Sequence, residues 1–348
     1  MIRPRDNVRN LKRYVAPLEG RRQKLRLDFN ENTQGPSPAV MEAIRQLPPN
    51  AYSTYPEYAG LESAFGDYLG VSGHEVAAFN GVDAAIRAVF DAYGEQGATF
   101  LTTAPTFAYY LPCAAQQGMM LTAIPYEADL SFPMAAFREA LAAVPRLCFI
   151  CNPNNPTGTW LAAAPLMELV RSAPETLFVI DELYADFVGE SVVQQAVLER
   201  NVIVLRSLSK AFGLAALRIG VAAGHPELLE GLRCVIGPYD INMFAVVAAR
   251  AALADLGHVE AYVQEVRVAR DWTVAELGRL GVRYFCDQGN YMLVWPPGDV
   301  EQVVNKLSQQ GILVRSMHGK PLIDGSFRLT VGTREQMARF MRVFAAIL

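Results

Sequence analysis

The sequence predicts an α/β fold in which a large, mostly parallel sheet is joined to a smaller α+β domain. Short apolar runs alternate with helical stretches through the middle of the chain, which is typical of parallel strands with helices on both faces of the sheet. Three of these runs end abruptly in polar residues, as strands do at a binding edge. The length of 348 residues leaves room for two hydrophobic cores and therefore for two domains.

The elements of the large domain can be placed in chain order. Residues 1–25 are polar and basic and are predicted to form an N-terminal arm. Apolar residues then recur at helical spacing over 61–69 and 83–93. The buried-strand candidates that follow are 98–102, 147–151, 177–180 and 202–205, and the helices between them include 133–144 and 162–172.

The remaining third of the chain predicts the smaller domain. Residues 243–280 are rich in Ala, Val and Arg and are predicted to be helical, including a helix that connects the two domains. Short strand candidates follow at 291–295, 312–315 and 327–331, and a terminal helix begins at Arg334. We therefore expect a large domain over 51–240 and a small domain formed by 26–50 together with 241–348.

The composition argues against several function classes. The net charge is −4, and like charges form no block beyond Arg21, Arg22 and their neighbours, so neither nucleic acid nor an anionic membrane is expected as the main partner. The basic N-terminus lacks the apolar stretch of a signal peptide, and no apolar run is long enough to span a bilayer. Together with five scattered cysteines, these features predict a cytoplasmic protein.

The sequence predicts no metal site. Cys148 and Cys151 form a C-x-x-C pair, but they lie in the strand candidate 147–151, where residues three apart face opposite sides. We interpret both as core residues. The four histidines show no spacing typical of metal ligands.

The segment 207–218 carries the most specific chemistry. It follows the apolar run 202–205 and contains two serines, Lys210 and Arg218. Hydroxyls and a fixed cation are suited to bind a phosphate, and an amine can form a Schiff base with a carbonyl cofactor. Taken alone, the segment also fits a solvated loop that follows a strand.

Two other predicted strands end in residues suited to the same site. Residues 147–151 run into the Asn/Pro/Gly stretch 152–158, and residues 177–180 run directly into Asp181. The stretch 152–158 alone would fit an ordinary turn. A carboxylate that follows a buried run needs a charged partner, however. Because ligands bind beyond the carboxyl ends of strands in open α/β sheets, we expect one shared site.

A fourth element fits this site as a phosphate cup. Residues 80–83 precede a predicted helix, whose free N–H groups and dipole favour an anion. Asp83 acting as a simple N-cap is an equally good interpretation. A Schiff-base lysine, a buried aspartate for a ring nitrogen and a phosphate cup together specify pyridoxal 5′-phosphate. The glycine-rich motifs of dinucleotide and nucleoside triphosphate sites are absent from the sequence.

With these residues in place, the chain resembles the fold-type I aminotransferases and, within them, the histidinol-phosphate aminotransferase family. The blocks 152–158 and 207–220 are highly specific as a pair, and the resemblance runs from Asn7 to the end. Further matching blocks are 27–32, 55–58, 104–107, 181–187 and 327–333. The resemblance implies a large, mostly parallel sheet of the seven-stranded type with pyridoxal 5′-phosphate bound to the large domain.

The resemblance also implies catalytic roles. Lys210 would hold the cofactor and move a proton at the substrate α-carbon, Asp181 would pair with the ring nitrogen, and Asn155 and Tyr184 would bind the phenolic oxygen. Phe107 would stack on the ring, where the family usually has tyrosine. The residues implied to hold the phosphate are Val82, Asp83, Ser207, Ser209 and Arg218, together with Tyr55 of a neighbouring subunit. A homodimer with active sites at the interface follows from this last role.

The substrate pocket is implied in the same way. Arg328 matches the arginine that binds the substrate α-carboxylate, a task that suits the guanidinium fork. Asn30, Glu31, Tyr14 and Arg315 match positions that line the pocket, although Tyr14 and Arg315 also fit a solvated surface.

The implied function is an aminotransferase reaction between a small-molecule amino donor and a 2-oxo acid acceptor. The leading hypothesis converts L-histidinol phosphate and 2-oxoglutarate to imidazole acetol phosphate and L-glutamate in histidine biosynthesis. The alternatives are an aromatic or specialised biosynthetic aminotransferase, a threonine-phosphate decarboxylase, or a scaffold that binds the cofactor without turnover. The scaffold is disfavoured because Lys210, Asp181, Asn155, Tyr184 and Arg328 are all present.

Overall fold

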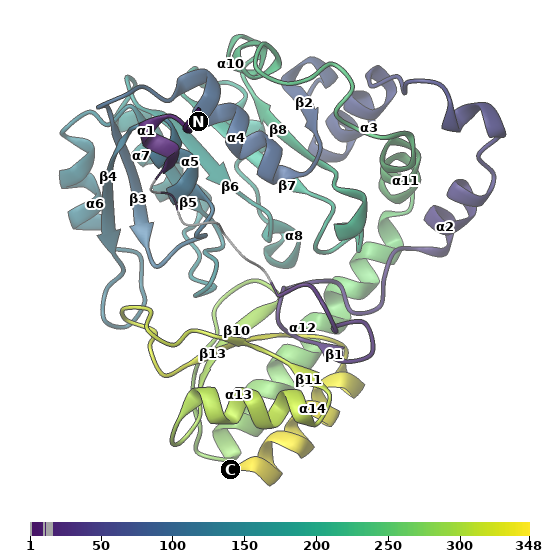
Figure 1. The fold of residues 1–348 in the computed structure, drawn as a ribbon, viewed down its shortest axis with the longest axis vertical. Coiled ribbons are helices and arrows are strands. Elements are labelled where there is room, and N and C mark those ends of the chain that lie inside the picture. The colour runs from purple at the N-terminus through teal and green to yellow at the C-terminus, as the bar shows by residue number, and fades with distance from the viewer. Residues whose placement is uncertain (1, 10, 12–16) are drawn as a thin grey trace.

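The computed structural model describes residues 2–9, 11 and 17–348. It contains a seven-stranded, a four-stranded and a two-stranded sheet in these ranges. Figure 1 shows the large sheet with its helices in the upper part of the molecule and the two smaller sheets below, together with helices from the C-terminal part of the chain. The predicted α/β class with a large, mostly parallel sheet is confirmed. The precise domain boundaries stay a prediction.

The large sheet has the strand order β2-β8-β7-β6-β5-β3-β4, and all its pairings are parallel except those of β8. The central strands β5, β6 and β7 are buried along their whole length, which explains their continuous apolar sequences. The strand bounds are β2 (Val76–Phe79), β3 (Thr99–Ala104), β4 (Met120–Pro125), β5 (Leu147–Cys151), β6 (Leu177–Asp181), β7 (Val202–Ser207) and β8 (Gly220–Gly224).

Helices cover both faces of this sheet. The apolar sides of α4, α5 and α10 share a core cluster with Phe149, while α3, α6, α7 and α11 contribute to a second cluster with Ile150. Cys148 and Cys151 are buried in different clusters, so they face opposite sides as strand geometry predicts. The helix bounds are α3 (Ala59–Leu69), α4 (Val82–Tyr93), α5 (Tyr110–Gln116), α6 (Met134–Leu141), α7 (Ala163–Ser172), α8 (Ala185–Val188), α9 (Val193–Ala196) and α10 (Pro226–Arg233).

Two consecutive helices lead from the large sheet to the small one. The sequence predicts helix throughout 243–280, but the structure divides it into α11 (Met243–Leu253) and α12 (Leu256–Arg279). The break falls at Asp255, whose φ of −123° and ψ of 54° are not helical. The long helix α12 then reaches the lower part of the molecule (Figure 1).

The smaller sheets bring distant segments together. The predicted strand 312–315 is divided, because β11 (Ile312–Leu313) pairs with β1 (Leu25–Arg26) whereas β12 (Arg315–Ser316) pairs with β13 (Phe327–Thr330). The chain that follows β1 is thereby placed beside the four-stranded sheet. The other bounds are α1 (Asp6–Arg9), α2 (Pro38–Arg45), β9 (Arg283–Phe285), β10 (Tyr291–Trp295), α13 (Val300–Gln309) and α14 (Arg334–Ile347).

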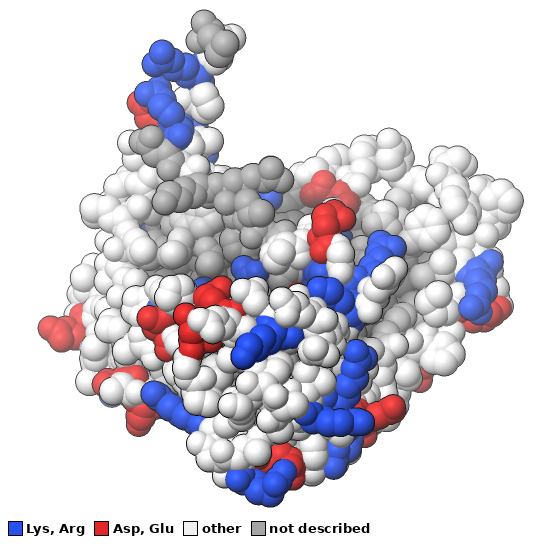
Figure 2. All heavy atoms as spheres, turned by 60° about the horizontal axis from the view of Figure 1, so that its bottom comes forward, with Lys and Arg blue, Asp and Glu red and all other residues white. Residues whose placement is uncertain are grey.

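The surface carries charges of both signs. On the face drawn in Figure 2, basic and acidic side chains lie interspersed among uncharged residues. In the part of the chain that the structure describes, no helix is long and apolar enough to cross a membrane. The same residues contain no group of three or more His, Cys, Asp or Glu side chains that could hold a metal ion.

Candidate active site

The carboxyl ends of β5, β6 and β7 form one edge of the large sheet. These strands are parallel, and Asp181 pairs in register with Cys151 on one side and Leu205 on the other. Asp181 therefore lies between the start of the loop that carries Asn155 and the end of the strand that leads to Lys210. The structure brings together the three strand ends that the sequence singles out.

Lys210 points from this edge toward the chain that follows β1. Its Nζ donates a hydrogen bond to the carbonyl oxygen of Phe29 over 3.0 Å. Desolvation and, to a smaller extent, the positive charge of Arg328 together lower the pKa of Lys210 to about 8. An amine with this pKa is neutral, and therefore nucleophilic, in a much larger fraction near pH 7 than an exposed lysine.

Asp181 is almost completely buried, with 1% of its surface exposed. Its carboxylate accepts hydrogen bonds from the hydroxyl of Tyr110 over 2.5 Å and from the backbone N–H of Leu183 over 3.2 Å. Burial raises the pKa of Asp181 to about 6, against the opposing effect of these hydrogen bonds. Sequence reasoning missed Tyr110, because the residue lies in an apolar helix and only the fold reveals its partner.

The N-terminus of α4 lies at the position of the predicted phosphate cup, and the binding of phosphate there stays a prediction. The helix begins at Val82 after Gly81, so Asp83 lies in the first turn and the N-cap interpretation of Asp83 is wrong. The Asp83 carboxylate instead accepts a hydrogen bond from Arg218 Nη2 over 3.0 Å. A Cβ at Gly81 would lie 2.6 Å from the same Nη2 atom, and the φ of Gly81 is +77°. Glycine is therefore required both by the backbone and by the close approach of Arg218.

The serines of β7 and its following loop lie beside this cup. Ser207 pairs in register with Gly220, where a Cβ would lie 3.0 Å from the amide nitrogen of Val82. The hydroxyl of Ser207 accepts a hydrogen bond from the backbone N–H of Ser209 over 3.1 Å. Ser207 therefore lies near the N-terminus of α4, where Arg218 also lies, and hydroxyls, helix N–H groups and a guanidinium are the donors that suit a phosphate group.

Arg328 and Tyr184 border the same site from two directions. Arg328, in β13, donates hydrogen bonds to Asn155 Oδ1 and, over 2.7 Å, to the carbonyl oxygen of Asp28. The Tyr184 hydroxyl accepts a hydrogen bond from Asn30 Nδ2 over 3.0 Å, and burial raises the pKa of Tyr184. The small sheet and the chain after β1 therefore complete the site that begins at the edge of the large sheet.

Positive charges gather around Arg328. Arg315 is its register partner on the neighbouring strand β12. Burial lowers the pKa of Lys320, and the positive charges of Arg328 and Arg315 lower it further, so the three cations lie within electrostatic reach of one another. Sequence reasoning missed Lys320, which lies in a hairpin loop without a recognisable motif. Glu31 is paired with Arg21 over 2.8 Å and with Arg26 over 3.3 Å.

The remaining predicted residues differ in their placement. Phe107 is half-buried and contacts Tyr110 edge-on, with ring centroids 5.5 Å apart, so it lies near Asp181. Tyr55 is 68% exposed and stacks on Tyr239 with ring centroids 4.0 Å apart, and no contact joins it to the site of its own chain among the described residues. Tyr14 lies outside the described residues.

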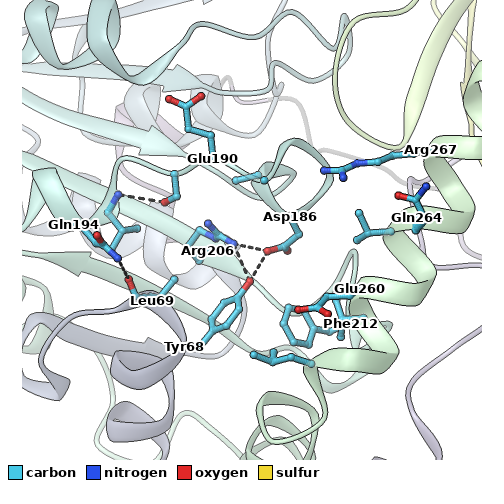
Figure 3. A pocket seen from close by; sticks show the side chains of 17 residues that line it. Tyr68, Leu69, Asp186, Glu190, Gln194, Arg206, Phe212, Glu260, Gln264 and Arg267 are labelled. Carbon is cyan, nitrogen blue, oxygen red and sulfur yellow. Dashed lines mark hydrogen bonds and ion pairs between the residues drawn. The ribbon is translucent and has the colours of Figure 1, made fainter.

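A cavity of about 830 Å³ lies elsewhere, between α3, α8, α9 and α12. Figure 3 shows Arg206 pointing in it toward Asp186 and Tyr68, with which it forms a buried hydrogen-bonded cluster. Arg206 precedes Ser207 on β7, so the two side chains face opposite sides of the sheet. None of the site residues predicted from the sequence lines this cavity.

A lysine with a lowered pKa, a buried aspartate, a helix N-terminus with a nearby guanidinium, and Arg328 thus lie around one edge of the large sheet. The profile of the class I and II aminotransferases matches residues 22–344. The chain belongs to this aminotransferase family. The aminotransferase is 33% identical to histidinol-phosphate aminotransferase 1 of Trichormus variabilis, over 99% of this chain and 98% of the relative. It is 34% identical to histidinol-phosphate aminotransferase of Symbiobacterium thermophilum, with the same coverage.

Solved structures agree on the fold of the aminotransferase. The crystal structure of histidinol-phosphate aminotransferase from Sinorhizobium meliloti in complex with pyridoxal 5′-phosphate superposes with a TM-score of 0.89. The two chains are 24% identical, and the match covers 100% of this chain and 99% of the other. The resemblance inferred from the sequence, and with it the fold-type I architecture, is confirmed.

Aminotransferases of this family use pyridoxal 5′-phosphate, and the residues present fit that cofactor. The buried carboxylate of Asp181 is hydrogen-bonded to a hydroxyl and an amide, and a protonated ring nitrogen would supply the countercharge that a buried carboxylate needs. The donor set around Gly81 suits the phosphate, and Lys210 supplies the amine. The roles of individual residues stay predictions.

Proposed function

We propose that this aminotransferase transfers the amino group of L-histidinol phosphate to 2-oxoglutarate, which gives imidazole acetol phosphate and L-glutamate in histidine biosynthesis. Relatives of that name, 33–34% identical over nearly the whole chain, support the proposal. The observation that carries it is the cluster of Arg315, Lys320 and Arg328 at one border of the site. Three cations this close to one another attract a dianionic group such as a phosphate.

Each catalytic side chain has a proposed task. When bound, pyridoxal 5′-phosphate supplies a ring that accepts negative charge from the substrate α-carbon. Lys210 would hold the cofactor through Nζ and, once the incoming amino donor has displaced that amine, would move a proton at the substrate α-carbon, for which its pKa of about 8 suits it. Asp181 keeps the ring nitrogen protonated through its negative charge. Asn155 and Tyr184 bind the phenolic oxygen, and Phe107 stacks on the ring.

The binding groups are proposed to divide the remaining contacts. Arg328 holds the α-carboxylate of 2-oxoglutarate and, in the other half-reaction, the phosphate of L-histidinol phosphate, which has no carboxylate. Its contacts with Asn155 and the Asp28 carbonyl fix the direction of its fork. Asn30 borders the same pocket through its contact with Tyr184. The phosphate of the cofactor is assigned to the N–H groups of residues 82–83 and to three side chains, Ser207, Ser209 and Arg218.

The assembly is proposed to be a homodimer with active sites at the interface, acting in the cytoplasm. Tyr55 is 68% exposed although it is aromatic, which supports a role at the partner's phosphate site rather than in its own chain. The neighbouring Tyr239 would hold its ring by stacking.

The donor can be tested by single-turnover reactions. The cofactor-loaded protein is mixed with histidinol phosphate, histidinol, threonine phosphate or phenylalanine, and the cofactor spectrum is followed. We expect histidinol phosphate to react with a kcat/KM at least about 100-fold above that of histidinol, since charge-assisted hydrogen bonds to the phosphate are lost in the latter. A faster reaction of phenylalanine would instead indicate an aromatic aminotransferase, and release of carbon dioxide from threonine phosphate would indicate a decarboxylase.

The phosphate contact predicts the effect of Lys320→Gln. Removal of one cation should raise the KM for histidinol phosphate about ten-fold and leave the slow reaction of histidinol unchanged. Lys306→Gln is the matched control, because Lys306 is an exposed lysine of α13 in the same domain. If Lys320→Gln slows the reactions of histidinol phosphate and histidinol equally, Lys320 does not contact the phosphate.

A further inference from the structure

The loop formed by residues 28–31 contacts three side chains of the proposed site through three successive residues. The carbonyl oxygen of Asp28 accepts a hydrogen bond from Arg328 over 2.7 Å, and that of Phe29 accepts one from Lys210 over 3.0 Å. Asn30 donates to the hydroxyl of Tyr184 over 3.0 Å. The orientation of the loop carbonyls therefore helps to fix the orientation of the side chains of Lys210 and Arg328.

The loop belongs to no helix or strand. It lies between β1, which ends at Arg26, and α2, which begins at Pro38. Asn30 has a φ of +55°, in the left-handed region that costs a side chain energy. The backbone N–H of Asn30 donates to the Thr330 hydroxyl over 2.9 Å, which ties one side of the loop to β13. Asn290 Nδ2 donates to the carbonyl oxygen of Asn30 over 3.2 Å, so Asn30 is held on this side, whereas the side chains of Asp28 and Glu31 need another partner.

Arg21 supplies that second attachment. Its guanidinium donates two hydrogen bonds to the Asp28 carboxylate, over 2.9 and 2.7 Å, and two to Glu31, over 3.2 and 2.8 Å. It also lies 3.9 Å from the centre of the Phe29 ring. Arg21 is only 8% exposed, so these contacts are largely shielded from water. One side chain thus contacts three of the four loop residues.

The chemistry of this contact requires an arginine. Asp28 and Glu31 would repel each other without a cation between them, and removing one partner of a buried ionic cluster is strongly unfavourable. A guanidinium can bind two carboxylates through separate edges and stack on an aromatic ring at the same time, whereas an ammonium acts as a point charge.

We propose that Arg21 is a positioning residue for transamination. It holds residues 28–31 so that the carbonyl oxygens of Asp28 and Phe29 face Arg328 and Lys210. The substrate carboxylate and the cofactor are then met by side chains that are already oriented. This inference rests on the proposed roles of Arg328 and Lys210 and extends the site into the segment before β1.

The test compares Arg21→Met and Arg21→Lys with Arg22→Met, in which the adjacent exposed arginine is changed. The measurements are the dissociation constant of maleate, a dicarboxylate that cannot react, the kcat and KM for 2-oxoglutarate, and the affinity of the apoprotein for pyridoxal 5′-phosphate. We expect Arg21→Met to weaken maleate binding about ten-fold or more and to reduce kcat/KM about 30-fold. Arg21→Lys should recover only part of this loss. Arg22→Met should match the wild type in every measurement.

A double-mutant cycle separates positioning from general stability. In an Arg328→Lys background, Arg21→Met should weaken maleate binding by less than about three-fold, because both changes remove the same oriented contact. Additive losses, or wild-type maleate affinity and kcat/KM in Arg21→Met, would overturn the proposal. If Arg21→Met does not fold, wild-type values in Arg21→Lys would overturn it. If the proposed amino donor is wrong, the wild-type protein will prefer another donor. If this inference is wrong, the maleate affinity and kcat/KM of Arg21→Met will equal those of the wild type, whichever donor is used.

Discussion

Lys210→Ala should reduce transamination by at least about 10⁴-fold, because it removes both the covalent attachment of the cofactor and the group that moves the α-proton. Lys210 lies in the loop that follows β7, with Nζ 3.0 Å from the Phe29 carbonyl oxygen. The measurement is a single turnover of the amino donor, followed through the cofactor spectrum. The variant should also lose the visible absorbance that sodium borohydride abolishes in the wild-type protein.

The pH dependence of cofactor capture provides an independent check on Lys210. Because the neutral amine is the nucleophile and its pKa is about 8, about a tenth of it is neutral at pH 7. The rate at which the apoprotein captures pyridoxal 5′-phosphate should therefore rise with pH and level off above about 8. Lys306→Ala is the control, since that lysine is exposed in α13. A rate that keeps rising toward pH 10 would contradict the lowered pKa.

The sequence predicted those parts of the site whose chemistry is local to the chain. Lys210, Asp181 and Asn155 each follow a continuous apolar run, and register between parallel strands is enough to bring such ends together. Tyr110 and Arg21 could not be predicted in the same way. Each acquires its importance from a partner that only the fold brings near, Asp181 for Tyr110 and the loop 28–31 for Arg21.

The fold departs from the sequence prediction where tertiary contacts override local pattern. Residues 312–315 read as one strand, but the chain changes partner at Val314, so the two halves join different sheets. Residues 243–280 read as one helical stretch, but the backbone turns at Asp255 to direct α12 toward the small sheet. Periodicity records which side of an element is apolar and carries no signal for these changes of direction.

Asp181→Asn should separate stability from activity. Burial raises the pKa of Asp181 from 3.8 to about 6, so the folded apoprotein binds more protons than the unfolded chain between these values. Stability of the apoprotein therefore falls as pH rises through this window, and the loss is complete above about pH 6. Replacing the buried carboxylate with a neutral amide should stabilise the apoprotein at pH 7 by an amount on the order of 2 kcal/mol.

The same change should reduce transamination by about 10²- to 10⁴-fold, because the ring nitrogen loses the negative charge that keeps it protonated. Urea unfolding of the apoprotein and single-turnover kinetics of the loaded protein measure the two effects. Asp186→Asn is the matched control, since Asp186 is a buried carboxylate on the other face of the sheet whose cation, Arg206, is present in the chain (Figure 3). That variant should lose about 1–3 kcal/mol of stability at pH 7, because Arg206 loses one of its two carboxylate partners and keeps Glu182. Stabilisation by Asp181→Asn together with destabilisation by Asp186→Asn would show that Asp181 has no cationic partner in the apoprotein, where the cofactor is absent. Destabilisation by both changes would contradict this.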